Sequence, residues 1–316
     1  MNPTKYALNL SIVKNMQKGL KIANTMINVL IKKRNFAINY DITWQCNLRC
    51  IHCYFYSSAA ELDLGEIHNR KELSDKQWIN IFRYHRSLGV YSASITGGEP
   101  TLRMNLLHEA VNTFPSVQIA TNGTIKIPYF KAKKQPILWV SLDGPKDLHN
   151  KIRGAPIFNK IIDNIQDDKR VFISCTVSSL NYKQIEKVVK IAHDAGTSGI
   201  FFLWYTGYDN DPLLLKGKSL KIAAEKVLKV MKEYGDFIIF SKKMLEYYIT
   251  KSFVPHCFFR KKNRIYSYYP NGQQKFCVMG NSPQLCKNCG CIVPVAVYAL
   301  KKFDRETINK LRKFPF

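Results

Sequence analysis

Three cysteines on one short stretch constrain this chain more than any other feature of its sequence. Cys46, Cys50 and Cys53 stand at the spacing C-x3-C-x2-C, and no further cysteine follows until Cys175. Three thiolates on one loop can hold a cluster of the 4Fe–4S type, in which cysteines usually bind all four irons. One iron is then open to another ligand. A structural zinc site is the weaker alternative, because zinc generally combines one C-x2-C pair with a second pair elsewhere.

The residues around these cysteines resemble a known loop. The apolar run at residues 36–43 predicts a buried strand that leads into it. With His52 at the aromatic position, residues 46–53 resemble the C-x3-C-x-aromatic-C loop of the radical S-adenosylmethionine (radical SAM) superfamily. The resemblance implies that the three cysteines hold a 4Fe–4S cluster beside His52, and that its open iron is chelated by the amine and carboxylate of S-adenosylmethionine (SAM). It also implies that an electron donor such as ferredoxin or flavodoxin drives cleavage of SAM to methionine and a 5′-deoxyadenosyl radical, which abstracts hydrogen from an unactivated carbon.

The charge balance is the second unusual feature. At 316 residues, 46% of them hydrophobic and 22% charged, the chain has the composition of one large globular domain with additions. It carries 48 Lys and Arg against 23 Asp and Glu, a formal net charge of +25. This charge favours an anionic partner, namely lipid headgroups, an acidic peptide or nucleic acid; a merely solvated basic surface is the alternative. Nine cysteines at short, clustered spacings favour metal ligation in a reducing compartment over a disulfide framework.

The first 35 residues contain no Asp or Glu and are predicted to form a basic amphipathic helical segment. Apolar side chains recur there every three or four residues, at Val13, Met16, Leu20, Ala23, Ile27 and Leu30. A basic helix with one apolar face suits an anionic membrane surface. Packing on the rest of the protein is the equal alternative, and an RNA-binding arm is weaker because aromatic residues for base stacking are scarce.

We expect a cytoplasmic protein, peripheral on the inner face of the cell membrane if the amphipathic segment binds lipid. The N-terminal segment lacks a continuous apolar core followed by a small-residue cleavage site, so no signal peptide is predicted. The apolar run at residues 22–31 is too short to span a bilayer.

From residue 36 to about residue 240, strand-like and helix-like segments alternate, which predicts an α/β fold built as a partial (β/α)6 TIM-like barrel. Strands are predicted at residues 36–43, 90–96, 117–121, 137–142, 171–177 and 200–204, and helices at residues 74–87 and 183–195. The ligand site is expected where the carboxyl ends of the strands converge.

Glycines and polar residues follow several of these strands. Gly97 and Gly98 have no Cβ, so their backbone can approach a ligand closely and accept hydrogen bonds from an ammonium group. With Glu99, which adds negative charge, they resemble the Gly-Gly-Glu-Pro turn that holds the methionine amine in radical SAM enzymes. Three later residues, Asn122, Ser141 and Asp143, can bond ribose hydroxyls or a carboxylate. Simple turn formation is the alternative for these positions.

A further segment resembles one branch of the superfamily. Residues 141–145 followed by 149–154 are similar to radical SAM enzymes with a C-terminal SPASM or twitch extension. The resemblance implies that Arg153 binds the SAM carboxylate and that Asn181 makes a polar SAM contact; a structural salt bridge is the alternative for Arg153. Cys175 lies within an apolar run and is expected in the core.

The region from residue 241 to 316 is predicted to form a second metal centre, because it holds five cysteines: Cys257, Cys277, Cys286, Cys289 and Cys291. Residues 266–272 predict a hairpin before Cys277, and this arrangement resembles the opening of a SPASM or twitch domain. The ending C-x2-C-x-C is shorter than the full SPASM pattern. We therefore expect one auxiliary 4Fe–4S cluster on Cys257, Cys277, Cys286 and either Cys289 or Cys291, with zinc as the alternative.

Both ends of the chain also resemble hopanoid-adenosylating radical SAM enzymes, which suggests a membrane lipid of isoprenoid or archaeal type as substrate. Hydrogen abstraction would then lead to C–C bond formation or a related modification at an anionic membrane surface. The alternative is a maturase of ribosomally made peptides, against which we count the lack of an evident peptide-recognition domain before the barrel. An RNA-modifying enzyme ranks third, and an electron carrier or zinc scaffold is the non-enzymatic alternative.

Overall fold

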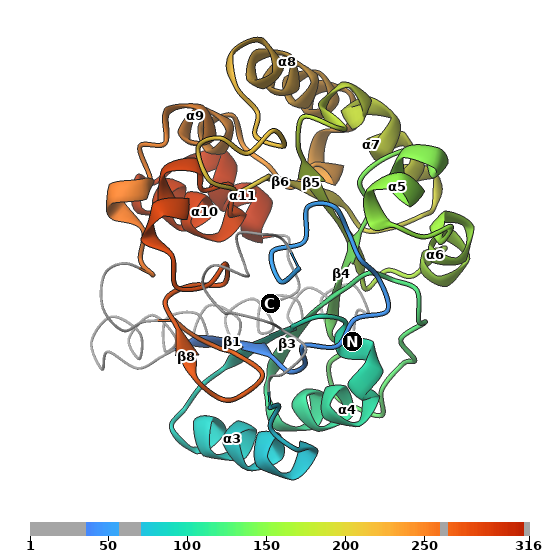
Figure 1. The fold of residues 1–316 in the computed structure, drawn as a ribbon, viewed down its shortest axis with the longest axis vertical. Coiled ribbons are helices and arrows are strands. Elements are labelled where there is room, and N and C mark those ends of the chain that lie inside the picture. The colour runs from blue at the N-terminus through green and yellow to red at the C-terminus, as the bar shows by residue number, and fades with distance from the viewer. Residues whose placement is uncertain (1–35, 57–70, 260–264, 313–316) are drawn as a thin grey trace, which may run out of the picture.

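The structure is a computed structural model of the chain and describes residues 36–56, 71–259 and 265–312. One eight-stranded sheet runs through it in the order β6-β5-β4-β3-β2-β1-β7-β8 (Figure 1). The strands are β1 (Ala37–Asp41), β2 (Ser92–Thr96), β3 (Ser116–Thr121), β4 (Ile137–Ser141), β5 (Val171–Val177), β6 (Ile200–Trp204), β7 (Ile265–Tyr268) and β8 (Gln274–Lys275). The predicted amphipathic segment at residues 1–35 lies outside the described residues.

Strands β1 to β6 are parallel and neighbour each other in chain order, and the sheet is not closed. The predicted partial barrel is therefore confirmed. In the pair of β1 and β2 the register runs from Ala37 opposite Ser92 to Asp41 opposite Thr96. Because neighbouring parallel strands end together, the loops that follow them meet at one end of the barrel.

Helices cover the outside of the barrel (Figure 1). They are α3 (Asp75–Ser87), α4 (Met104–Thr113), α5 (Lys146–Arg153), α6 (Phe158–Ile165), α7 (Ile185–Asp194) and α8 (Gly217–Tyr234). Helix α3 begins at a capping box between Ser74 and Gln77 and buries Trp78 and Phe82 completely. The predicted helix at residues 183–195 is a short 3-10 turn, η3 (Tyr182–Gln184), followed by α7.

The core lies between the sheet and these helices. Its fully buried side chains include Ile38 on β1, Ile95 on β2, Ile119 on β3 and Ile173 on β5. Cys175 on β5 is 1% exposed and belongs to this core, as predicted. Apolar runs on parallel strands are buried on both faces, which is why the sequence marked these strands clearly.

The C-terminal region holds α9 (Lys242–Thr250), α10 (Ile292–Lys301) and α11 (Arg305–Arg312) as well as the last two strands. The predicted hairpin is confirmed, because β8 pairs antiparallel with β7. Strand β7 also pairs in parallel with β1, from Ala37 opposite Ile265 to Tyr40 opposite Tyr268. The hairpin therefore extends the barrel sheet.

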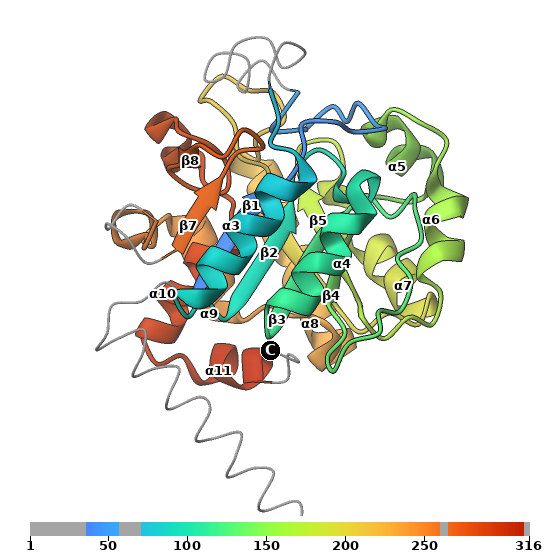
Figure 2. The same ribbon diagram turned by 90° about the horizontal axis from the view of Figure 1, so that it is seen from below.

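The two ends of the barrel differ. Figure 2 shows the loop after β1 at one end of the strands and α11 at the opposite end. Among the helices of the described ranges, none is long and apolar enough to cross a membrane.

Candidate functional site

The loop after β1 is fastened on two sides. On one side the amide of Gly98 donates to the carbonyl of Thr43 (2.8 Å), and the amide of Glu99 donates to the carbonyl of Gln45 (2.8 Å). On the other side the amide of Ile51 donates to the carbonyl of Ile152 in α5 (2.9 Å). The loop carrying Cys46, Cys50 and Cys53 thus spans the mouth of the barrel from β2 to α5.

The three thiols of this loop are half-buried and near one another. The pKa of Cys46 is raised, and that of Cys53 is raised to about 11, mainly because both thiols are partly buried. The charges of neighbouring loop cysteines raise both pKa values further. Thiolates are the ligand form of cysteine, so a bound cationic cluster would relieve this repulsion. Within the described ranges, no three His, Cys, Asp or Glu side chains converge as they do around a single metal ion. A cubane does not require such convergence, because each thiolate binds a different iron.

Gly97 and Gly98 are required by the loop itself. Gly97 has a φ of +137°, and a Cβ there would lie 2.7 Å from the carbonyl oxygen of Thr43. A Cβ on Gly98 would lie 2.2 Å from the carbonyl oxygen of Gln45. The sequence predicted close approach of this backbone to a ligand. The structure adds a close approach to the cysteine loop.

Glu99 is fully buried and joins the turn after β2 to the end of β3. Its Oε1 accepts bonds from the Thr101 amide (3.0 Å) and from the hydroxyls of Thr101 (2.6 Å) and Thr121 (2.8 Å). Its Oε2 accepts from the amide of Asn122 (2.7 Å). Burial raises the pKa of Glu99 against the opposing effect of these bonds. Glu99 therefore sets the position of Asn122, and its own contact with the SAM amine stays a prediction.

Asn122 reaches the cysteine loop directly. Its Nδ2 donates to Oδ1 of Asn47 (2.8 Å) and lies 4.0 Å from Sγ of Cys46. Its Oδ1 accepts from the amide of Thr124 (2.9 Å). Ser141 ends β4 and is half-buried. Both residues lie at the end of the barrel where the loop lies.

Asp143 and Arg153 form a buried ion pair beside the loop. Oδ2 of Asp143 lies 2.5 Å from Nη2 of Arg153, and its Oδ1 accepts from the amide of Thr176 (2.9 Å). Nη1 of the same arginine lies 3.7 Å from Sγ of Cys50. Burial has the largest single effect on the pKa of Asp143 and raises it, but Arg153, the two neighbouring histidines and the Thr176 amide together outweigh burial, so the net shift is downward and the carboxylate stays charged. The salt bridge weighed as an alternative is thus present, and it holds the guanidinium against the cysteine loop.

Two histidines adjoin this pair. Burial lowers the pKa of both His52 and His149 to about 4, so both are neutral near pH 7. Nε2 of His52 lies 3.7 Å from Oδ2 of Asp143, a polar contact between a neutral ring and a carboxylate. Nδ1 of His149 accepts from the amide of Asp143 (3.2 Å). His149 was not among the predicted site residues, and its place in residues 149–154 was its only signal.

Asn181 joins the ends of β4 and β5. Its Nδ2 donates to the carbonyls of Asp143 (2.8 Å) and Thr176 (2.9 Å), and its Oδ1 accepts from the amide of Ser178 (2.7 Å). The side chain is 2% exposed. In this structure Asn181 supports the backbone around Asp143, and its predicted SAM contact stays a prediction.

The five C-terminal cysteines come together from four elements: Cys257 after η5 (Val254–His256), Cys277 after β8, Cys286 in η6 (Pro283–Asn288), and Cys289 and Cys291 before α10. We call this group the auxiliary site. Burial is the main cause that raises the pKa of Cys277 to about 11 and of Cys289 to about 12, and Cys257 raises both further. The charge of Cys286 also raises the pKa of Cys277. Burial raises the pKa of Cys291, and the charge of Cys289 raises it further.

Gly290 attaches the auxiliary site to the end of β6. Its carbonyl accepts from the amide of Trp204 (3.2 Å) and from the hydroxyl of Tyr248 (2.7 Å), and its amide donates to Oγ1 of Thr206 (2.9 Å). A Cβ on Gly290 would lie 1.8 Å from the carbonyl oxygen of Trp204. In the sequence this glycine is distinguished only by its place between two cysteines. Its absent side chain lets the auxiliary site lie against the barrel.

Asp41 and Lys275 form an ion pair that the sequence did not indicate. Both side chains are completely buried, and Nζ of Lys275 also donates to the carbonyl of Val278 (2.9 Å). Oδ1 of Asp41 accepts from the hydroxyl of Thr96 (2.5 Å). Asp41 ends β1 before the cysteine loop, and Lys275 ends β8 just before Cys277. The pair therefore lies between the two groups of cysteines.

Comparisons with known proteins agree with this arrangement. The sequence model described as "Radical SAM superfamily" matches residues 40–181. The antilisterial bacteriocin subtilosin biosynthesis protein AlbA of Bacillus subtilis (strain 168) is 28% identical over 179 residues, covering 52% of this chain and 38% of AlbA. The mycofactocin maturase MftC of Mycobacterium tuberculosis (strain ATCC 25618 / H37Rv) is 28% identical over 174 residues, covering 51% of this chain and 42% of MftC.

Solved structures extend the likeness to most of the fold. Streptococcus suis SuiB bound to S-adenosylmethionine superposes with a TM-score of 0.59 at 19% identity, covering 84% of this chain and 66% of SuiB. SuiB bound to its precursor peptide SuiA gives a TM-score of 0.58 at 18% identity, covering 83% of this chain and 65% of SuiB. This chain spans less than half the length of AlbA and MftC and just under two thirds of SuiB.

Proposed function

We propose that this chain is a radical SAM enzyme that cleaves SAM reductively and abstracts hydrogen from a peptide substrate; the match of its residues 40–181 to the radical SAM superfamily model supports this proposal. One observation carries the assignment of the site: the three thiols of the loop lie between the Gly97–Gly98 turn and the guanidinium of Arg153. A turn offering carbonyls and a fixed cation are complementary to the amine and carboxylate of an amino acid.

The donor set fits the cofactors of this superfamily. Three cysteines on one loop match the three protein ligands of a 4Fe–4S cluster, and the cluster, when bound, supplies the electron that cleaves SAM. Within this chain, the carbonyls of Gly97 and Gly98 would accept from the SAM amine, and Arg153 would bind its carboxylate. Asn122 and Ser141 would bond the ribose, and neutral His52 would lie beside the nucleoside.

We propose that the auxiliary site binds one further 4Fe–4S cluster through Cys257, Cys277 and Cys286, with Cys289 or Cys291 as the fourth ligand. Five part-buried thiols gathered on one side of the barrel support a metal centre, and burial raises the pKa of three of them, Cys277, Cys289 and Cys291. Four thiolates also suit zinc, so metal analysis of the purified protein decides between the two. On this division, residues 36–240 form the barrel and residues 241–316 the auxiliary region.

A peptide is favoured over the lipid that the ends of the sequence suggested. SuiB, which shares the fold, has been solved with its precursor peptide, and MftC is named a maturase. None of these names refers to a lipid. The net charge of +25 fits an acidic peptide as well as an anionic membrane. A lipid substrate with peripheral membrane attachment is the second candidate, favoured by the wholly basic sequence of residues 1–35.

The Cys50→Ala variant should form no 5′-deoxyadenosine after anaerobic iron–sulfur reconstitution and reduction, because one corner of the cluster loses its ligand. The matched control is Cys175→Ala, since Cys175 is a core residue on β5 and should leave SAM cleavage intact. Chromatography of 5′-deoxyadenosine and methionine measures the result. Cleavage by Cys50→Ala at the wild-type rate would refute the assignment of the loop.

The substrate class is tested by tracing deuterium from the carbon atoms of a substrate into 5′-deoxyadenosine. The enzyme is given deuterium-labelled peptides encoded by short reading frames next to the gene. In a separate reaction it is given a deuterium-labelled total lipid extract of the source cells. Deuterium should appear in 5′-deoxyadenosine with a peptide and not with the lipids. Transfer from lipid alone would replace the peptide proposal by the lipid one.

A further inference from the structure

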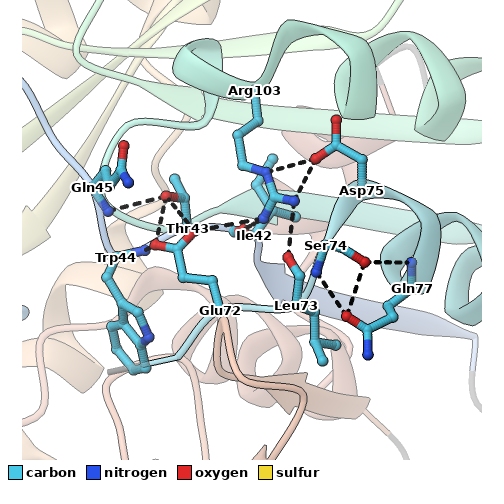
Figure 3. A network of polar contacts seen from close by, with 10 residues as sticks. All are labelled: Ile42, Thr43, Trp44, Gln45, Glu72, Leu73, Ser74, Asp75, Gln77 and Arg103. Carbon is cyan, nitrogen blue, oxygen red and sulfur yellow. Dashed lines mark hydrogen bonds and ion pairs between the residues drawn. The ribbon is translucent and has the colours of Figure 1, made fainter. Parts of the chain in front are cut away.

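Arg103 lies at a junction of three segments that meet at the entrance to the cysteine loop (Figure 3). It ends η2 (Pro100–Arg103), the short turn that directly follows Gly97, Gly98 and Glu99. Its side chain is 15% exposed. A guanidinium has five N–H donors in a fixed plane, so one residue can bond several segments at once.

The donors of Arg103 are distributed over those segments. Nη1 donates to the carbonyl of Ile42 (2.5 Å) at the exit of β1 and lies 3.6 Å from Oε2 of Glu72. Nη2 donates to the carbonyl of Leu73 (2.9 Å), and Nε donates to Oδ1 of Asp75 (3.0 Å) in the first turn of α3. The same guanidinium therefore joins the exit of β1, the start of α3 and the turn after β2.

Glu72 connects Arg103 to the residues that begin the loop. Its Oε1 accepts from the amide of Trp44 (2.6 Å) and from the hydroxyl of Thr43 (2.9 Å), and that hydroxyl accepts from the amide of Gln45 (3.0 Å) (Figure 3). The next residue along the chain is Cys46. Arg103 thus neutralises the carboxylate that orients the three residues before the first cysteine.

The same three residues contact the glycine turn. The carbonyl of Thr43 accepts from the amide of Gly98, and the carbonyl of Gln45 accepts from the amide of Glu99. The backbone of residues 43–45 is therefore held by Glu72 and Arg103 as well as by the turn that would accept the SAM amine. A shift of this backbone would move both Cys46 and the turn.

We propose that Arg103 is a positioning residue for SAM binding: through Glu72 it holds the loop entrance and the Gly97–Gly98 turn in one arrangement. It would not contact SAM itself. This assignment rests on the proposed function for SAM cleavage and is independent of whether the substrate is a peptide or a lipid.

The test compares Arg103→Gln with the matched control Arg83→Gln, whose exposed guanidinium lies 3.9 Å from Glu109. Each protein is reconstituted anaerobically and reduced, and SAM is titrated against the electron paramagnetic resonance spectrum of the cluster. Arg103→Gln should weaken SAM binding about tenfold or more, the usual effect of losing a residue that orients the groups of a metal site without contacting the ligand. Arg103→Lys, which keeps the charge and loses the planar fork, should weaken it less. Arg83→Gln should bind SAM like the wild type.

A second variant distinguishes a loss of positioning from misfolding of Arg103→Gln. Thr43→Val removes the hydroxyl that bonds Glu72 and Gln45 and leaves Arg103 with its partners. It should also weaken SAM binding, and the unfolding temperature of each variant, measured in parallel, shows whether that loss occurs in folded protein. Wild-type affinity in both Arg103→Gln and Thr43→Val would overturn the positioning role. Wild-type protein that takes up the cluster without any spectral response to SAM would instead overturn the proposed function, and the role of Arg103 with it.

Discussion

Replacing Lys275 by methionine is expected to lower the free energy of unfolding by about 3–5 kcal/mol, the usual cost of leaving a buried charge unpaired. Asp41 would lose its cation while its side chain remains completely buried. The bonds it accepts from the Thr96 hydroxyl and the Asn39 amide do not neutralise its charge.

The surroundings of Lys275 explain why solvent cannot take its place. Nζ lies 5.2 Å from the ring centre of Tyr269, 5.6 Å from that of Tyr54 and 5.8 Å from that of Phe55. Rings at this distance stabilise a cation and also exclude water. Strand β8 has only two residues and is separated from β1 by β7, so the ion pair is a direct tie from the hairpin to the strand before the cysteine loop.

Denaturant unfolding of the reconstituted protein under anaerobic conditions measures this effect. The double variant Asp41→Leu with Lys275→Met should recover most of the loss, because an apolar pair replaces both charges. Lys190→Met is the control: Lys190 pairs with Asp194 on the exposed face of α7, and its loss should leave the unfolding midpoint unchanged. If Lys275→Met and the double variant lost the same free energy of unfolding, packing and not charge would explain the effect.

The barrel was predictable because its strands carry the signal of buried parallel β-structure. The apolar run predicted at residues 171–177 is β5, and the run at residues 200–204 is β6, with the same bounds. The helix predicted at residues 74–87 is α3, and Ser74 is its N-cap. These features depend on neighbouring residues, so one sequence is enough to indicate them.

The pairing of β7 with β1 was not predictable in the same way. These strands lie more than 220 residues apart in the sequence, and a four-residue strand gives no information about its partner. The same holds for Asp41 with Lys275 and for Arg103 with Glu72. Such residues are normally at the surface, so only the fold reveals that distant charges meet inside it.

The sequence predicted which residues gather at the site, but only partly what each of them contacts. Gly97 and Gly98 were expected to face a ligand, and the structure shows that the cysteine loop also needs them. Asp143 was expected to bond SAM, and it binds Arg153. A turn motif indicates which residue types gather near a ligand. Whether a side chain faces the ligand or supports a neighbour depends on distances between loops, which the sequence does not contain.

Replacing Arg153 by glutamine is expected to weaken SAM binding by about 10- to 100-fold, because a charged hydrogen bond to a carboxylate contributes about 1.5–3 kcal/mol. The guanidinium is held in place before any ligand binds, since Asp143 fixes Nη2 and leaves Nη1 facing Cys50. A preorganised cation loses little entropy on binding. Titration of SAM against the spectrum of the reduced, reconstituted cluster measures the change.

Asp143→Asn separates the two roles of this pair. It keeps the guanidinium but removes the partner that orients it, so SAM binding should weaken less than in Arg153→Gln. The fold, however, should lose stability in both variants, because each leaves one buried charge unpaired: Arg153 in the first, Asp143 in the second. If Arg153 served only as a structural partner of Asp143, the two variants would lose SAM affinity equally, in proportion to their loss of stability. A larger loss of affinity in Arg153→Gln at equal stability therefore identifies the guanidinium as the group that binds the SAM carboxylate.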